Sequence, residues 1–436
     1  MKRLLATLVT AICGAALLGA YLVPTTAEAA PYTPKQGVVF NNAAGSKTSE
    51  RRIQTVLDKA ISAVPGCPAG KAGCQTITMA MYLFSQKSTA DRLIAAHRRG
   101  VNVHFLIDNG AWDASQIKRL RKAFGTSKAR RSYVVKCNKG ACMTNYPYAT
   151  IHVKYYLFSQ SGRAKKVSII SSANPHRVNI YNSFNNTHTI TGNTAIYNRL
   201  MKYFSDMTLN RQNHSYGNGK NTASGPFTLY IYPQRPVRIH YLDVLRTVKC
   251  RTAKNMGSKG RTVVRMSMWG FTNPRMDVAK KLWSLQNAGC KVDVTLNRGR
   301  ASRSIMRQLT KTTRHGKMVV EDAWKDKNRN DYAEQYTHHK AMIVNGYVQG
   351  RNQRVVWTGS QNLTSTGSLY NDDMVLRITG SGYYFAYSKN FSYIQKKSKR
   401  LRSTPPPIVL KSHRSDDARL SPDAYVEARA NAVDGG

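Results

Sequence analysis

Two short segments of the sequence place a lysine two residues after a histidine: His152 with Lys154, and His338 with Lys340. Apolar and β-branched residues follow both pairs, so the pattern predicts that each pair belongs to a strand. Residues two apart on a strand share a face, so each histidine would point the same way as its lysine. An unpaired buried ammonium group is costly, and a bound anion is therefore a natural explanation for these lysines.

A serine and an asparagine, also two residues apart, follow each pair further along the chain: Ser172 with Asn174, and Ser360 with Asn362. We predict that these four residues and the two lysines bind the oxygens of one phosphodiester and neutralise the charge of its transition state. One histidine can attack phosphorus to form a phosphohistidine, while the other protonates the departing alcohol and later activates water. This chemistry requires no metal and no cofactor, and none is predicted.

The elements that would position these residues occur twice, because 76–108 and 261–297 share one order of strand, amphipathic helix, glycine and strand. The expected elements are the strands 77–84 and 101–107 around the helix 90–99, and the strands 263–271 and 290–296 around the helix 276–287. A β-α-β order implies parallel pairing with right-handed crossovers. We therefore predict an α/β fold of two similar halves, which face each other across a pseudo-twofold axis and bring the matching motifs together.

The two halves are expected at 30–209 and 226–402. Between them, 210–225 is rich in Asn, Gly, Ser and Lys and is predicted to be a linker. The polar segment 403–436 lacks an apolar repeat and is predicted to be a flexible tail.

The first residues, 1–29, are typical of a secretory signal peptide. Lys2 and Arg3 precede an apolar run, and small residues at Ala27 and Ala29 suit a cleavage site. The apolar run is also nearly long enough to span a bilayer, so an uncleaved anchor is the alternative. We predict cleavage after Ala29 and a secreted, extracellular protein.

Six cysteines lie beyond this segment, and an even number in an exported chain suggests disulfides. Many pairings are possible, and the simplest joins sequence neighbours, because short loops close at low entropic cost. These neighbours are Cys67 with Cys74, Cys137 with Cys142, and Cys250 with Cys290. A zinc site is the weaker alternative, since no Cys-x-x-Cys spacing occurs.

The chain has 67 Lys and Arg against 22 Asp and Glu, a formal net charge of +45. These basic residues occur in many segments, so the folded surface itself is expected to be cationic. Such a surface attracts phosphate-rich partners. We predict a phospholipid or membrane surface as the partner, with nucleic acid as the alternative and no obligate protein partner. A general adaptation to export, with no single partner, also accounts for the charge.

The paired His-x-Lys segments and the Ser-x-Asn turns resemble the His-x-Lys-x4-Asp motifs of the phospholipase D superfamily, over about residues 31–402. The chain is most similar to secreted phospholipase D-like proteins of actinobacteria. This resemblance implies two α-β-α sandwich halves, with His152 as the nucleophile and His338 as the general acid and base. It also implies the phosphate-binding residues Lys154, Lys340, Asn174 and Asn362. The sequence alone leaves open which histidine attacks.

The chain departs from the family pattern at the motif aspartate, which is replaced by Ser159 in the first copy and by Asn345 in the second. Both positions lie an odd number of residues after the histidine, so on a strand they would face the other side of the sheet. We therefore expect a structural role for them, which a substitution can preserve.

A second departure concerns acidic residues. Asp372 and Asp373 follow the second copy, whereas the first copy has Asn185 and Asn186. A carboxylate beside a histidine favours its protonated form and sets its tautomer. We therefore interpret Asp372 or Asp373 as the group that keeps His338 protonated, which supports giving the acid role to the second half.

Other residues near the motifs allow two interpretations. Aromatic residues could line an acyl or base pocket, although aromatic residues on strands more often belong to the core; these are Tyr155, Tyr156, Trp269 and Trp357. His176, His188 and His339 are interpreted as structural or surface residues.

The function that these observations favour is hydrolysis of phospholipid head-group phosphodiesters, a phospholipase D reaction, by a metal-independent phosphohistidine mechanism. An extracellular nuclease with the same mechanism is the first alternative, because the same paired motif serves several substrates. A noncatalytic cationic protein that binds phosphate is the second, and it would follow if the substitutions have silenced the site.

Overall fold

The computed structural model describes residues 32–138, 140–144, 146, 148–236, 240–327 and 333–406. The expected signal peptide, 1–29, lies outside the described residues, as does the expected tail from 407 onward. In the part of the chain that is described, no helix combines the length and the apolar character needed to cross a membrane.

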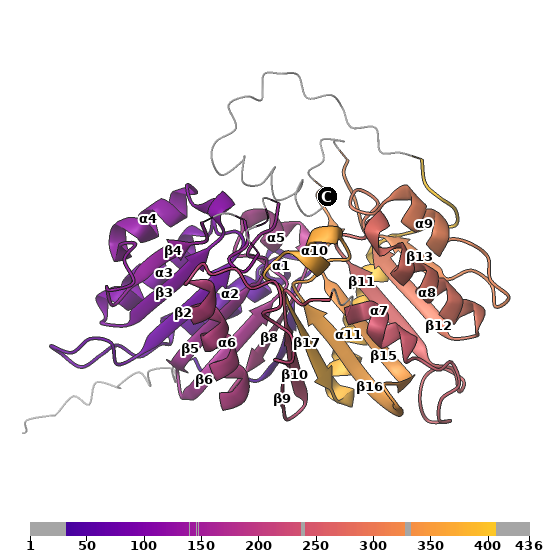
Figure 1. Cartoon of the computed structure of the whole chain (residues 1–436), viewed down its shortest axis with the longest axis horizontal. Helices are drawn as coiled ribbons and strands as arrows, with labels where there is room; N and C mark the ends of the chain where they lie inside the picture. Colours follow the sequence, from indigo (N-terminus) through magenta and orange to yellow (C-terminus); the bar gives the residue numbers. More distant parts are fainter. Residues whose placement is uncertain are drawn as a thin grey trace, which may run out of the picture. The chain divides into compact units, whose positions relative to one another are not determined.

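The first half is built on a sheet of seven strands (Figure 1). Their order is β1 (Gly37–Phe40), β8 (Asn186–Ile190), β6 (Ala164–Ser171), β5 (Tyr155–Ser161), β2 (Thr76–Met81), β3 (Asn102–Ile107) and β4 (Tyr133–Lys136). Strands β2, β3 and β4 are parallel neighbours, and the other neighbours pair antiparallel.

The second half repeats this arrangement in a sheet of nine strands (Figure 1). Their order is β18 (Lys399–Arg400), β13 (Val319–Asp322), β12 (Lys291–Leu296), β11 (Val263–Met268), β15 (Lys340–Val348), β16 (Arg351–Gly359), β17 (Met374–Thr379), β10 (Phe227–Ile231) and β9 (Thr222–Ser224). The run from β10 to β13 matches the run from β1 to β4 strand for strand. The predicted α/β fold of two similar halves is therefore confirmed.

Each half has the predicted crossover helix between its parallel strands. Helix α3 (Lys87–Arg98) joins β2 to β3, and helix α8 (Met276–Asn287) joins β11 to β12. In α3 the buried residues recur every three or four positions, so one face packs on the sheet. Gly100 and Gly289 follow the two helices with φ of +89° and +90°, a conformation that favours glycine, so both helices stop there.

The remaining helices cover the sheets and the loops. They are α1 (Lys47–Glu50), α2 (Arg52–Ser62), α4 (Ser115–Phe124), α5 (Arg177–Tyr181), α6 (Thr194–Met207), α7 (His240–Arg246), α9 (Arg303–Leu309), α10 (Ser365–Leu369) and α11 (Ser381–Lys397), with 3-10 turns at Asn109–Ala111 and Asn273–Arg275.

Apolar side chains form one core within each half and a third core that both halves share. The shared core combines residues of β5, β6 and α6 with residues of β15, β16, β17 and α11. Since each half buries part of its apolar surface only against the other, the halves are held together by the hydrophobic effect.

The segment 210–225, predicted to be a linker, contains regular structure. Thr222–Ser224 forms the edge strand β9, and Tyr216 is buried with its ring stacked on Tyr203 at 5.3 Å. The connection between the halves is therefore packed against the fold over part of its length.

Disulfides join sequence neighbours, as the simplest pairing predicted. They are Cys67–Cys74, Cys137–Cys142 and Cys250–Cys290. The sulfurs of Cys137 and Cys142 also lie within 4.8 Å of the Asp372 carboxylate, a spacing that could suit a metal ion. Sulfurs bound in a disulfide are not thiolates, so this cluster is unsuited to zinc.

Candidate active site

The two His-x-Lys pairs lie where their strands begin. His152 and Lys154 precede β5, while His338 precedes β15 and Lys340 is its first residue. The prediction that each pair belongs to a regular strand is therefore correct only for Lys340. All four side chains are buried.

The histidines lie outside the regular strands because the backbone around each of them is hydrogen-bonded to the other half of the molecule. The N–H of His152 donates to the carbonyl of Asp372, and the N–H of His338 donates to the carbonyl of Phe184, both at 2.9 Å. Next to His338, β14 (Tyr336–Thr337) pairs in parallel with β7 (Ser183–Phe184). Both motifs are thus anchored at the interface between the halves.

His152 is hydrogen-bonded to a carboxylate of the second half. Its Nδ1 lies 3.0 Å from Oδ1 of Asp373, and both side chains are completely buried. The Ser360 hydroxyl donates to the same carboxylate oxygen and accepts from the N–H of Met374 at 3.1 Å. The expectation that Asp372 or Asp373 supports His338 is wrong, because the carboxylate crosses the interface to the other histidine.

His338 is hydrogen-bonded to a side-chain amide of the first half. Its Nδ1 lies 2.9 Å from Oδ1 of Asn185, which also accepts from the Ser172 hydroxyl at 2.9 Å. The amide nitrogen of Asn185 donates to the carbonyl of Asn179 at 3.0 Å and to the hydroxyl of Ser183 at 2.7 Å. These donors fix the orientation of the amide, so its oxygen faces the imidazole.

The two lysines form different contacts. Nζ of Lys154 donates to the carbonyl of His152 at 2.6 Å, whereas Nζ of Lys340 lies 2.9 Å from Nε2 of His338. Both ammonium groups are completely buried, as expected for groups that would bind an anion.

The asparagines of the Ser-x-Asn turns occupy equivalent places in the two halves. Oδ1 of Asn174 accepts from the N–H of Leu83, just beyond β2, and Oδ1 of Asn362 accepts from the N–H of Gly270, just beyond β11. The hydroxyls of the same turns orient the groups that bond the histidines, as described above. Phosphate binding by Asn174, Asn362, Ser172 and Ser360 remains a prediction.

Aromatic rings flank the histidines at equivalent positions. The ring of Tyr82 lies 5.5 Å from that of His152, and the ring of Trp269 lies 5.3 Å from that of His338. Trp269 is therefore part of the site, and Tyr82 is a neighbour that the sequence analysis missed. Tyr155, Tyr156 and Trp357 are fully buried core residues.

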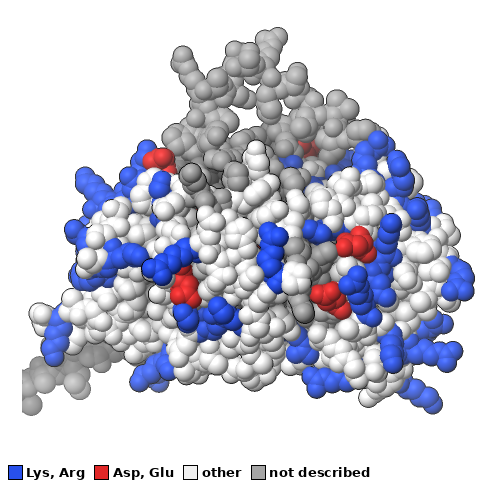
Figure 2. Space-filling view, viewed as in Figure 1, with Lys and Arg blue, Asp and Glu red and all other residues white. Residues whose placement is uncertain are grey.

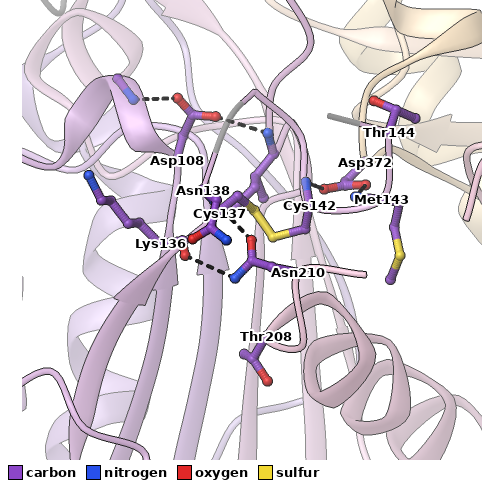
Figure 3. The surroundings of a disulfide bond; sticks show 12 residues. Asp108, Lys136, Cys137, Asn138, Cys142, Met143, Thr144, Thr208, Asn210 and Asp372 are labelled. Carbon is purple, nitrogen blue, oxygen red and sulfur yellow. Dashed lines mark hydrogen bonds between the residues drawn. A yellow bond between two sulfur atoms is a disulfide. The ribbon is translucent and has the colours of Figure 1, made fainter. Parts of the chain in front are cut away.

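Asp372 binds a disulfide loop, as Figure 3 shows. Its carboxylate accepts hydrogen bonds from the N–H of Cys142 at 2.7 Å and from the N–H of Met143 at 3.2 Å. These two residues lie at the end of the turn that the Cys137–Cys142 disulfide closes. Burial raises the pKa of Asp372 well above its usual value, and the two N–H groups oppose that shift. Asp372 therefore joins the disulfide loop of the first half to the acidic segment of the second.

Two further expectations concern the replaced aspartates. The hydroxyl of Ser159 donates to Gln75 at 2.6 Å and accepts from the N–H of Thr76 at 2.8 Å, so its structural role is confirmed. Asn345 lies in the register of β15 opposite Val263, within the sheet.

The three remaining histidines of the motif regions are buried. His188 bonds Tyr387 through Nε2 at 2.8 Å, and His339 bonds Asn186 through Nδ1 at 2.8 Å. Burial lowers the pKa of His188 and of His339 to about 3, and Lys340 also lowers that of His339. His176 is buried beside Asn174.

Each of the two matched lobes buries one imidazole and ammonium pair at their interface. The model of one family, described as cardiolipin synthase, PLD-like domain, matches residues 70–208 and 257–395, together more than half of the chain. The chain therefore belongs to the phospholipase D superfamily, whose members act on phosphodiester bonds.

Solved structures with this fold include two that align over most of the chain. Phosphatidylserine synthase of Haemophilus influenzae Rd KW20 is 12% identical, with a TM-score of 0.57, over 91% of this chain and 94% of that one. Polyphosphate kinase of Porphyromonas gingivalis is 12% identical, with a TM-score of 0.55, over 92% of this chain. The chain spans 53% of that kinase. At these identities the likeness shows the fold alone. No curated protein sequence matches the chain.

Proposed function

We propose that the protein is a secreted, metal-independent phosphodiesterase that hydrolyses the head-group phosphodiester of phospholipids, a phospholipase D reaction. The observation that carries this proposal is the crossed pairing at the interface, in which each histidine is bonded at Nδ1 by a residue of the opposite half. Such pairing holds two imidazoles in fixed orientation beside two buried ammonium groups.

His152 is the better supported nucleophile. Its Nδ1 is engaged with Asp373, so Nε2 is the nitrogen that would bond phosphorus. As the P–N bond forms, the imidazole gains positive charge, which the Asp373 carboxylate offsets. The bond from phosphorus to the head-group oxygen breaks, and this oxygen keeps the electron pair and takes a proton from Nε2 of His338, so the head group leaves as an alcohol.

His338 would act as the general base for the attacking water. Water forms a new P–O bond as the P–N bond to His152 breaks, and Nε2 of His338 takes the water proton. Lys154 and Lys340 would bind the nonbridging oxygens through both steps, together with Asn174 and Asn362.

The substrate proposal depends on export and on charge. The net charge of +45 favours a phosphate-rich surface, and Lys and Arg are spread over the visible face with only small groups of acidic residues between them (Figure 2). The same charge favours an extracellular nuclease, which is the second candidate.

Incubation of the mature protein with phosphatidylcholine vesicles and with plasmid DNA, both in EDTA, tests the proposal, with His152→Ala as the control. Choline release that is lost in His152→Ala supports the phospholipase. Cleavage of DNA alone assigns the nuclease. Binding of both substrates without product would refute an enzymatic role and support a noncatalytic phosphate-binding protein.

A further inference from the structure

Three tyrosines form a cluster at the surface, where the two halves meet. Tyr146 and Tyr148 have exposed fractions of 36% and 67%, and their ring centroids lie 5.9 Å apart. The ring of Tyr146 also stacks on that of Tyr370 of the second half, with centroids 4.1 Å apart and planes inclined by 12°. Aromatic pairs of this kind stabilise each other. The tyrosine cluster therefore keeps its arrangement although two of its rings face water.

One basic residue contacts the tyrosine cluster, and another lies near it. The guanidinium carbon of Arg235 lies 5.8 Å from the ring centroid of Tyr370. The N–H of Arg235 donates to Oδ1 of Asn218 at 2.9 Å, and the exposed Lys220 follows Asn218 by two residues. Neither cation forms an ion pair with a carboxylate of the described residues. Their charge therefore favours an anionic partner.

The tyrosine cluster is joined to the backbone that carries the proposed nucleophile. Tyr148 precedes His152 by four residues, and Tyr370 precedes Asp373 by three. The two segments are paired, because the N–H of His152 donates to the carbonyl of Asp372 at 2.9 Å. A partner bound at the cluster would therefore meet the molecule a few residues from the site.

The chemistry of the cluster favours a phospholipid bilayer over a nucleic acid. Tyrosine is enriched at membrane–water interfaces, where its ring lies among the head groups and its hydroxyl stays in water. Arginine and lysine add attraction to anionic lipids. The bases of a single strand stack on open ring faces, but Tyr146 and Tyr370 each cover a face of the other. A bilayer can take up the exposed ring edges without breaking this stack.

We infer that the tyrosine cluster, with Arg235 and Lys220, is a docking surface for a phospholipid bilayer and presents the site to the lipid head groups. The inference rests on the proposed phospholipase function, because a lipid substrate lies in a bilayer and must be reached there. Docking is a separate event from the reaction at His152, so the two can be measured separately.

Cosedimentation of the protein with vesicles tests the inference. One set of vesicles is phosphatidylcholine, and the other is phosphatidylcholine with phosphatidylglycerol. We expect Tyr148→Ser to lower the partition coefficient by about tenfold on both sets, because it removes a ring that the bilayer would bury. Arg235→Gln should lower it by about fivefold on the anionic vesicles and little on the neutral ones. Phe385→Ser is the matched control, since it removes a similarly exposed ring on α11 and should leave binding unchanged.

A Tyr148→Ser protein that binds both sets of vesicles as tightly as the wild type would overturn the inference, as would an equal loss of binding in Phe385→Ser. Weaker binding of a single-stranded oligonucleotide by Tyr148→Ser, with unchanged binding to vesicles, would overturn it in favour of nucleic acid. Tyr148 is largely exposed, so its replacement leaves no cavity in the fold.

Choline release from the same vesicles tests the proposed function apart from docking. A wild-type protein that binds vesicles through Tyr148 but releases no choline would refute the phospholipase and not the docking surface. Choline release that is equally fast in Tyr148→Ser and the wild type, with equal binding to the vesicles, would refute the docking surface and not the phospholipase.

Discussion

Nδ1 of His152 lies 3.0 Å from Oδ1 of Asp373, and the two residues belong to opposite halves of the chain. Asn185 makes the reciprocal contact to His338. Because each half completes the histidine environment of the other, neither half contains a whole site. The duplication thus serves the chemistry as well as the packing of the shared core.

Replacing the Asp373 carboxylate by an amide tests whether its negative charge contributes to catalysis. We expect Asp373→Asn to lower kcat for phosphodiester cleavage by about 100-fold or more, because the amide cannot offset the positive charge on His152. The measurement is release of 4-nitrophenol from bis(4-nitrophenyl) phosphate, with the fold checked by circular dichroism. A variant with the wild-type kcat would exclude Asp373 from the mechanism.

The buried lysines should control the affinity for phosphate. We expect Lys154→Met and Lys340→Met each to weaken binding of inorganic phosphate by about tenfold or more, since each removes a charge-assisted hydrogen bond. Titration calorimetry measures this directly. Lys87→Met is the control, because Lys87 is exposed and paired with Asp91 on α3. Equal affinity for inorganic phosphate in all three variants would show that phosphate binds away from Lys154 and Lys340.

The disulfides allow a test of how Asp372 acts. Loops of 7 and 5 residues are closed by Cys67–Cys74 and Cys137–Cys142, so removing either bond should lower the free energy of unfolding by about 2 kcal/mol on loop entropy. We expect only the Cys137→Ser/Cys142→Ser protein to lose activity as well, because its loop binds Asp372. Denaturant unfolding and the cleavage assay measure the two effects. Equal activity of both double variants would show that the loop has no influence on the site.

The stability of the fold should depend on pH through buried histidines. Burial lowers the pKa of His188 from 6.5 to about 3, so below pH 6.5 the unfolded chain binds a proton that the folded chain does not. The free energy of unfolding should therefore fall as the pH drops from 6.5 towards 3, by about 1.4 kcal/mol per pH unit for this histidine.

Unfolding curves between pH 4 and 7 measure this slope. We expect His188→Gln to make it shallower by about that amount, whereas Tyr387→Phe, which removes the partner but keeps the imidazole, should leave it unchanged. An identical slope in His188→Gln and the wild type would rule out His188 as a source of the pH dependence.

The sequence predicted what depends on local spacing. The β-α-β order follows from apolar periodicity and from Gly100 and Gly289, and it recurs because the chain is duplicated. The disulfides join cysteines that are near in sequence, so loop entropy predicted their pairing. The His-x-Lys pairs identified the site for the same reason, because two copies in matching units are a strong signal.

The tertiary structure alone decided which residue bonds which histidine. Asp373 follows the second motif in the chain but is hydrogen-bonded to the histidine of the first, 221 residues away, because the segment before β17 packs against the segment before β5. The interval of 13 residues from Ser172 to Asn185 and from Ser360 to Asp373 could have shown that the two positions are equivalent. Local spacing carries no information about how two sheets pack against each other, so the partner of each histidine appears only when both halves are in place.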